Sequence, residues 1–167
     1  WGALSNVTLY SGFQQLEDKY SNLLLGAGFN LGSVGALSFD ASQSVADIKE
    51  NPASDKTSSS EGQSYRVRFS KDFPLTGTNF SVAGYRYSTH GYYSLQNFID
   101  NANAYSGCCS STGRTKDRFD ASASQVFSGY GSLSLSLVSE SYWDNSRMES
   151  LGVSYSNTFG RVSYFIN

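Results

Sequence analysis

Two alternating segments in the middle of the chain predict a β-hairpin between Gly62 and Phe98. The first arm places Tyr65, Val67 and Phe69 opposite Arg66, Arg68 and Ser70, and the second places Ala83, Tyr85 and Tyr87 opposite Gly84, Arg86 and Ser88. The break between the arms, residues 73–77, contains Pro74 and Gly77, which mark a turn. Because side chains alternate between the two faces of a strand, this hairpin has one apolar face and one cationic, polar face.

The same period of two continues on both sides of the hairpin. Alternation recurs in residues 7–13, 20–31, 34–45, 118–127, 131–137, 151–156 and 162–166, and it is cleanest where leucine and serine alternate from Gly131. The pattern predicts about nine strands of about ten residues, a length that spans a membrane when the strand is tilted. No segment shows a convincing helical pattern, so the expected fold class is all-β.

The connections between the predicted strands alternate in character. Those at Gly32, Pro74, Gly129 and Gly160 are short, and those at Gln14, Ile48, Tyr92 and Asp144 are polar. In an up-and-down barrel, alternate connections lie at the same rim, and outer-membrane barrels have short turns at one rim and longer loops at the other. We therefore expect an antiparallel up-and-down transmembrane β-barrel architecture. Residues 48–60 and 94–113 should be its most mobile loops, on the extracellular rim.

The composition agrees with a membrane barrel better than with a soluble enzyme. Of the 167 residues, 15% are aromatic and 16% are charged, against roughly 25% charged in ordinary soluble domains. The net charge of −2 gives no reason to expect a nucleic acid as partner. The sequence contains no nucleophile elbow, phosphate-binding loop or metal-ligand constellation, so we expect neither an enzyme nor a bound cofactor or metal.

The polar faces of the predicted strands carry the candidate functional residues. A charge facing lipid is costly, so the face that carries the charges should line the lumen. The lumen-facing candidates are Arg66, Arg68, Arg86, Asp40, Asp120, Glu140, Ser134 and Ser154. The lipid-facing candidates are Tyr65, Val67, Phe69, Leu133, Leu135, Leu137, Leu151, Val153 and Tyr155.

Aromatic residues, the histidine and the cysteines leave alternatives open. Aromatic side chains near predicted strand ends fit either an interfacial girdle or ordinary enrichment in sheets; they are Tyr20, Tyr85, Tyr87, Tyr92, Tyr93, Tyr142 and Trp143. His90 is more simply placed at a strand end than in a catalytic site. The neighbours Cys108 and Cys109 are either a tolerated loop pair or a vicinal or intermolecular disulfide.

The central hairpin also resembles a known family. Residues 62–66, 69–71, 76–79, 83–89 and 91–93 are similar to the outer-membrane ushers of chaperone–usher fimbriae, and residues 83–89, Ala-Gly-Tyr-Arg-Tyr-Ser-Thr, are the most specific part. Residues 35–38 and 141–143 extend the resemblance more loosely. The shorter loop after Tyr93 and the pair Cys108–Cys109 depart from the family pattern and leave the fimbrial type open.

The resemblance implies a fold and a function. Ushers have a large barrel of about two dozen strands, a plug domain and periplasmic domains that receive chaperone–subunit complexes. No plug or periplasmic domain is recognisable here, so residues 1–167 are expected to form a single segment of the barrel wall, about 8–10 strands of the pore. The expected partners are outer-membrane lipid, fimbrial subunits and their chaperone complexes. The alternatives are a small self-contained barrel or passive porin, and a soluble β-sandwich binding module.

An odd number of strands predicts open edges. Bacterial single-chain barrels have even strand counts, so residues 7–13 and 162–166 should be the edges of this segment. Unpaired edges recruit other strands, and we therefore expect the isolated segment to pair with a second copy or to close as a smaller barrel.

Overall fold

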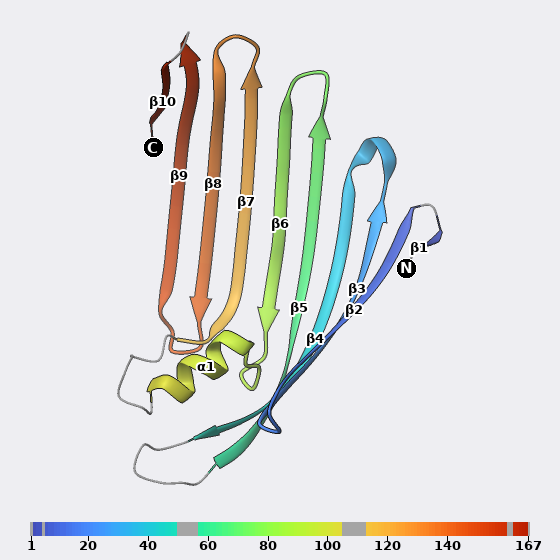
Figure 1. Ribbon diagram of the computed structural model, residues 1–167, viewed down its shortest axis with the longest axis vertical. Helices are drawn as coiled ribbons and strands as arrows, with labels where there is room; N and C mark the ends of the chain where they lie inside the picture. Colours follow the sequence, from blue (N-terminus) through green and yellow to red (C-terminus); the bar gives the residue numbers. More distant parts are fainter. Residues whose placement is uncertain (1, 5, 50–56, 105–112, 160–161, 167) are drawn as a thin grey trace.

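The structure is one antiparallel sheet of ten strands and one helix (Figure 1). It is a computed structural model that describes residues 2–4, 6–49, 57–104, 113–159 and 162–166. In chain order the elements are β1 (Gly2–Leu4), β2 (Val7–Leu16), β3 (Tyr20–Asn30), the short 3-10 helix η1 (Gly32–Val34), β4 (Ala36–Lys49), β5 (Thr57–Phe73), β6 (Thr78–Ser88), α1 (Leu95–Ala104), β7 (Thr115–Phe127), β8 (Gly131–Tyr142), β9 (Arg147–Phe159) and β10 (Val162–Ile166).

The strands follow one another across the sheet in chain order, as the up-and-down prediction required. Strands β2 to β10 correspond to the nine predicted strands, and β1 is an additional one. Among the described residues, β1 pairs with Val7 and Thr8 only, so the prediction that residues 7–13 form an edge is corrected at those two positions, and the rest of β2 extends past β1. At the other side, β10 pairs with β9 and with no second strand among the described residues, so the sheet does not close on itself.

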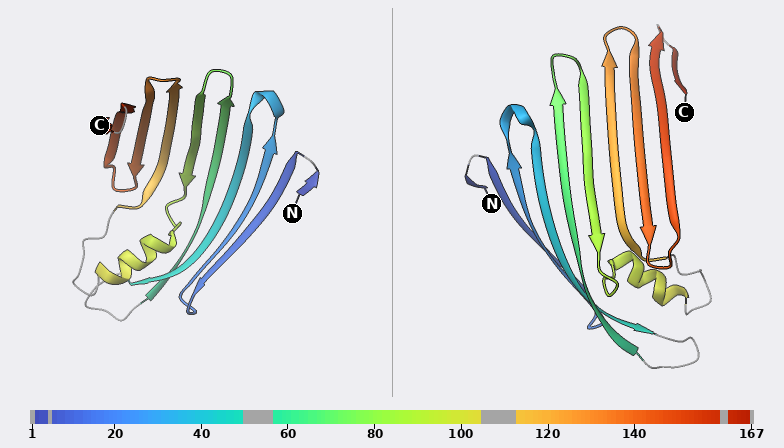
Figure 2. Two further views of the ribbon diagram at one scale, coloured as in Figure 1. Left: turned by 45° about the horizontal axis from the view of Figure 1, so that its top comes forward. Right: turned by 180° about the vertical axis from the view of Figure 1, so that it is seen from behind.

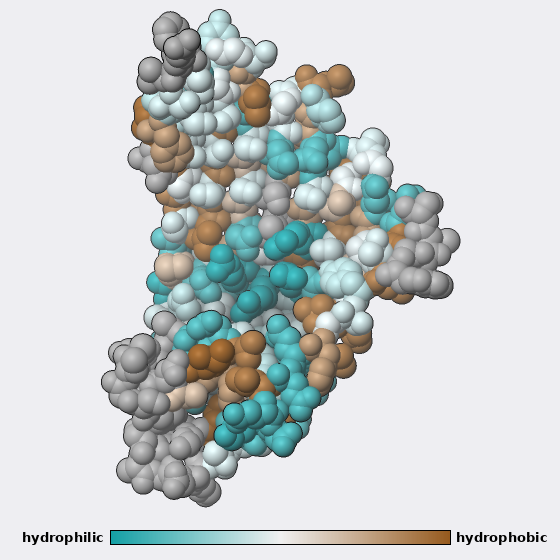
Figure 3. Space-filling model, viewed as in Figure 1, coloured by the Kyte–Doolittle hydropathy of each residue, from teal (hydrophilic) through white to brown (hydrophobic). Residues whose placement is uncertain are grey.

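The alternation predicted from the sequence gives the sheet two different faces. Leu135, Leu151 and Val153 are among many large hydrophobic side chains exposed on one face, which we call the apolar face. Asp40, Ser42 and the side chains in register with them form the opposite, polar face. On the polar face, hydrophilic residues gather across the middle of the sheet (Figure 3). No helix in the described part of the chain is long and apolar enough to cross a membrane.

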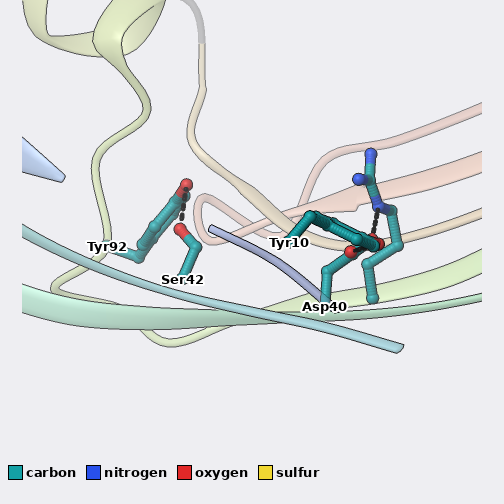
Figure 4. Close-up of polar contacts among 5 residues, drawn as sticks. Tyr10, Asp40, Ser42 and Tyr92 are labelled. Atoms are coloured by element: carbon teal, nitrogen blue, oxygen red, sulfur yellow. Dashed lines mark hydrogen bonds and ion pairs between the residues drawn. The ribbon is translucent and has the colours of Figure 1, made fainter. Parts of the chain in front are cut away.

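The sheet is curved, and the polar face is its inner face. Figure 2 shows the curvature from two further directions. In Figure 4, Tyr10, Asp40 and Ser42 point to the same side of the sheet, and the strands of the C-terminal half rise on that side. The polar face is therefore concave and the apolar face convex, which is the arrangement of a barrel wall.

The helix α1 corrects the prediction that residues 94–113 form a loop. Apolar Leu95, Phe98 and Ile99 have helical spacing, and the Ser94 hydroxyl accepts a hydrogen bond from the backbone N–H of Asn97, as an N-cap does. The other predicted loop, residues 48–60, is also shorter than expected, because β4 continues to Lys49 and β5 begins at Thr57. Residues 50–56 and 105–112, with both cysteines, lie outside the described residues.

Residues 89–104, which we call the docked segment, lie on the polar face near one rim. The backbone N–H of Tyr93 donates to Ser44 Oγ at 3.0 Å, and the Tyr20 hydroxyl donates to the Tyr93 carbonyl at 3.2 Å. The rings of Tyr20 and Phe98 are 5.3 Å apart. Tyr20, Ala46, Tyr93 and Phe98 form the buried apolar core of the described residues. Tyr20 and Tyr93 thus belong to this core, and the suggestion that they form a lipid-interface girdle is wrong.

Gly62 and Gly91 make the close approach of the docked segment possible. A Cβ on Gly62 would lie 2.0 Å from the backbone nitrogen of Tyr92, and a Cβ on Gly91 would lie 1.9 Å from the Glu61 carbonyl oxygen. Only glycine leaves room for two backbones at that distance. Thr89 continues the β5–β6 pairing, because its N–H donates to the Gln63 carbonyl at 2.8 Å.

Candidate functional site

Five charged residues stand in one row across five strands of the polar face. Strand register places Asp40 opposite Arg66, Arg66 opposite Arg86, Arg86 opposite Arg118, and Arg118 opposite Glu140. We call these five residues the charged row. They lie on five consecutive strands, β4 to β8, and span about 19 Å at the usual spacing of strands. The row is the only place where the register brings three arginines side by side among the described residues.

One end of the charged row is held by a buried carboxylate. Asp40 is 7% exposed, and its Oδ2 accepts a hydrogen bond from Arg66 Nε at 2.7 Å. The Tyr10 hydroxyl reaches over Gly26 and donates to the other oxygen, Oδ1 (Figure 4). Both oxygens of Asp40 therefore have partners, and the negative charge is neutralised by an adjacent guanidinium.

The other end is held by two acidic residues. Arg118 Nη1 lies 3.5 Å from Glu140 Oε2, and Arg118 Nε lies 3.6 Å from Asp120 Oδ1. Glu140 is buried, and its Oε1 accepts a hydrogen bond from the Thr115 hydroxyl at 2.6 Å. Arg118 is thus balanced by two carboxylates, as Arg66 is balanced by Asp40.

The centre of the row differs from its ends. Arg86 has no ion pair or side-chain hydrogen bond with any residue that the structure describes, and its Nε is buried without a partner. Arg68, two residues after Arg66 on β5, is opposite Ser38 and is exposed. Ser134 and Ser154 are opposite each other on β8 and β9, on the same polar face. Beside the row, this part of the face carries small hydroxyl side chains rather than deep pockets.

The structure brings together most of the residues that the sequence suggested. Arg66, Arg86, Asp40, Asp120 and Glu140 form one cluster, whereas Arg68, Ser134 and Ser154 share the face without joining it. Sequence reasoning missed Arg118 and Tyr10. The signal for Arg118 was available, because it is two residues before Asp120 in the same alternating strand. Tyr10 had no such signal, since only the register of three strands brings it to Asp40.

Replacing Asp40 with Asn is expected to lower the free energy of unfolding by about 1–2 kcal/mol. The amide keeps the shape but loses the charge that pairs with Arg66, and the effect is moderated because the Arg66 side chain is 41% exposed. The measurement is the urea midpoint of the sheet signal in circular dichroism, with the protein in detergent micelles. Glu149→Gln is the control, because its ion pair with Arg147 is exposed on both sides and should contribute little. Equal losses in both variants would show that the Asp40 pair contributes no more than a surface pair.

His90 lies just after β6, at a strand end as predicted. It lines a small polar cavity beside the docked segment. The cavity has a volume of about 350 Å³ and is lined in part by His90, Tyr93, Arg114 and Trp143. Arg114 Nη2 lies 3.1 Å from His90 Nε2, and the Arg114 guanidinium lies 4.7 Å from the centre of the Tyr93 ring. These contacts tie the start of the docked segment to the strand that follows it. At the same rim, the Ser146 hydroxyl and N–H donate to Asp144 and hold the pKa of that carboxyl below its usual value.

Comparison with known proteins places the whole chain in one family. The family profile described as "Outer membrane usher protein" matches residues 1–167. The probable outer membrane usher protein LpfC' of Escherichia coli O157:H7 is 34% identical over 99% of this chain. The outer membrane usher protein LpfC of Salmonella typhimurium is also 34% identical over 99% of this chain. The structure of the translocation pore of the P pilus usher, PapC, matches 96% of this chain with a TM-score of 0.70 and 28% identity.

The matches concern only a part of each relative. This chain covers 32% of LpfC' of E. coli, 19% of LpfC of S. typhimurium and 31% of the PapC pore chain. Its antiparallel sheet corresponds to a segment of the β-barrel of that pore. Ushers are transporters and not enzymes, in agreement with the sequence. The alternating sheet, the polar concave face and the family profile over all 167 residues lead to one conclusion: this chain belongs to the outer membrane usher family.

Proposed function

We propose that residues 1–167 form one continuous segment of the wall of an outer-membrane pore. The pore exports and assembles fimbrial subunits that a periplasmic chaperone delivers. The observation that carries this proposal is that the two faces of the sheet differ in character. The convex face is apolar and suits lipid, and the concave face carries charges and serines and suits a water-filled lumen. Small serine side chains on the concave face offer a folded subunit no deep pocket in which to be retained.

Two alternatives fit the molecule less well. A soluble β-sandwich needs two packed sheets, whereas the described residues form one sheet whose apolar face is exposed. A small self-contained barrel or passive porin needs a closed sheet, whereas no described residues of β10 and β1 pair with each other. An open sheet is expected of a segment whose remaining strands belong to the rest of a larger pore.

The proposal is tested by complementation in a strain that lacks its own usher. The full-length protein, produced with its cognate chaperone and subunits, should restore surface fimbriae that are counted by electron microscopy. A passive porin would instead admit small solutes into liposomes and leave the cells bare. Bare cells that nevertheless contain the folded protein in the outer membrane would contradict the export function.

The docked segment and the turn at Ser146 should lie at the extracellular rim. Outer-membrane barrels have their longer loops outside, and the docked segment, the end of β4 and the start of β5 are at this rim (Figure 1). In the full-length protein with Cys108 and Cys109 replaced by Ser, Ser146→Cys should react with a membrane-impermeant maleimide on intact cells. Ser128→Cys, at the opposite rim, should react only after the outer membrane is permeabilised. The reverse result would reverse the orientation.

We also propose that the isolated segment dimerises through its open edge at β10. The outer side of this strand has no neighbour among the described strands, and in the whole pore further strands would cover it. Light scattering in detergent should give the mass of a dimer, with and without reductant, because edge pairing needs no disulfide. A monodisperse monomer would contradict edge pairing. A dimer found only without reductant would indicate a bridge between cysteines instead.

A further inference from the structure

We propose that the centre of the charged row, Arg86 with Arg66 and Arg118 beside it, is a docking site for an acidic side chain on the exported subunit. The inference rests on the proposed function, since it needs cargo in the lumen. It specifies where the exported subunit contacts the wall of the pore, and that the contacting side chain of the subunit is negatively charged.

The first step is that the arginine at the centre of the row has no ion pair. Like charges directly opposite each other on neighbouring strands are unfavourable, and here three guanidinium groups follow one another. Asp40 balances Arg66, and Glu140 with Asp120 balances Arg118. Among the described residues, no carboxylate forms an ion pair with Arg86. The three arginines are matched in number by three carboxylates, but all three carboxylates are engaged by Arg66 and Arg118, so Arg86 has no ion pair of its own.

The second step is the condition of the Arg86 side chain. Its Nε is buried without a hydrogen-bond partner, which is costly for a donor, whereas Arg86 as a whole is only half-buried. A guanidinium binds a carboxylate through two parallel N–H···O bonds, so an incoming carboxylate would give Arg86 both an opposite charge and hydrogen-bond acceptors. The unsatisfied group thus identifies the chemistry of the partner.

The third step is access, which favours a protein surface over a free anion. The side chains of Arg66 and Arg118 are each 41% exposed, so an approaching carboxylate meets an open surface around Arg86 rather than a closed pocket. Strand register places the row on the concave face, and hydrophilic residues gather across the middle of that face (Figure 3). An open surface of this kind holds a small ion weakly, because no walls surround it. A carboxylate presented by a large surface that slides along the lumen is held there by its other contacts.

The test uses the full-length protein with its own chaperone and subunits, in the complementation assay described above. Arg86→Glu should lower the number of surface fimbriae at least tenfold, because the site then repels the cargo carboxylate. Arg147→Glu is the matched control; it reverses the charge of an exposed arginine at the rim and should leave assembly unchanged. Heat-modifiable migration of the barrel verifies that each variant is folded. If Arg86→Glu does not fold, Arg86→Gln replaces it, with an expected loss of severalfold.

Suppressor selection then identifies the source of the carboxylate. Starting from Arg86→Glu, restored assembly should come from changes of Asp or Glu to Lys or Arg in an exported subunit. Suppressors confined to the usher itself would place the carboxylate in the usher's own chain and overturn the cargo assignment. Normal assembly by Arg86→Glu, or an equal loss in Arg147→Glu, would overturn the docking site. Failure of the unaltered protein to assemble fimbriae would count against the proposed function instead, so the two failures are distinguishable.

Discussion

Replacing Gly62 with Ala is expected to make the backbone amides of residues 89–104 exchange with solvent about a hundredfold faster. The added Cβ would lie 2.0 Å from the backbone nitrogen of Tyr92 and 2.3 Å from the carbonyl carbon of Gly91. Neither backbone atom can move aside as a side chain would, so the docked segment has to lift from β5. Overpacking costs about 1–3 kcal/mol, and each 1.4 kcal/mol is a factor of ten in an equilibrium.

Gly28→Ala is the matched control for this substitution. Gly28 lies on the polar face of β3, and a Cβ there would meet only the Thr8 carbonyl oxygen at 3.9 Å, an ordinary contact. Hydrogen exchange followed by mass spectrometry, on the full-length protein in detergent, reports the protection of each peptide. Unchanged protection of residues 89–104 in Gly62→Ala would show that the contact between the two backbones is looser than described.

The second large effect is expected from a charge on the apolar face. Leu135→Arg should lower the free energy of unfolding by about 2–4 kcal/mol, the cost of an arginine at the midplane of a lipid-facing strand. Leu135 lies near the middle of β8, opposite Ala123 and Val153, and is 45% exposed on the convex face. Urea titration of the full-length protein folded into lipid vesicles measures the change.

Ser134→Arg is the neighbouring control on the concave face. A long charged side chain there points into the water-filled lumen that we propose, so the expected loss is below about 1 kcal/mol. Cysteine probes at the same two positions give an independent readout: a label at 135 should be quenched by lipid, and a label at 134 should react with water-soluble reagents. A larger loss at 134 than at 135 would exchange the two faces.

The strands, and the face to which each of their side chains points, were predictable from the alternation within single strands. The alternation of Leu133, Leu135 and Leu137 with serines places these leucines on the exposed convex face, as expected. The helix was missed because its apolar positions, Leu95, Phe98 and Ile99, lie among polar residues typical of loops. The Ser94 cap and the spacing of three and four residues were signals that could have identified it.

The charged row was predictable only in part, for a physical reason. Alternation assigns Arg66 and Arg86 to a polar face, but it says nothing about which residue of one strand stands opposite which residue of the next. That register results from the turns and bulges of the whole sheet, including the shifts that interrupt the pairing of β5 with β6 and of β6 with β7. The lone position of Arg86 between two balanced arginines is therefore a property of the folded sheet.

The contact between Tyr20 and Tyr93 has a consequence for the order of folding. All ten strands pair with neighbours in the chain, so hairpins can form one after another by closing short loops. The hydrogen bond from Tyr20 to Tyr93 instead joins residues 73 positions apart. The entropic cost of closing so long a loop becomes small only after the pairing of β3 to β6 has brought the two residues close together. The docked segment is thus a late step of folding, and its protection from exchange reports that the strands beneath it have been assembled.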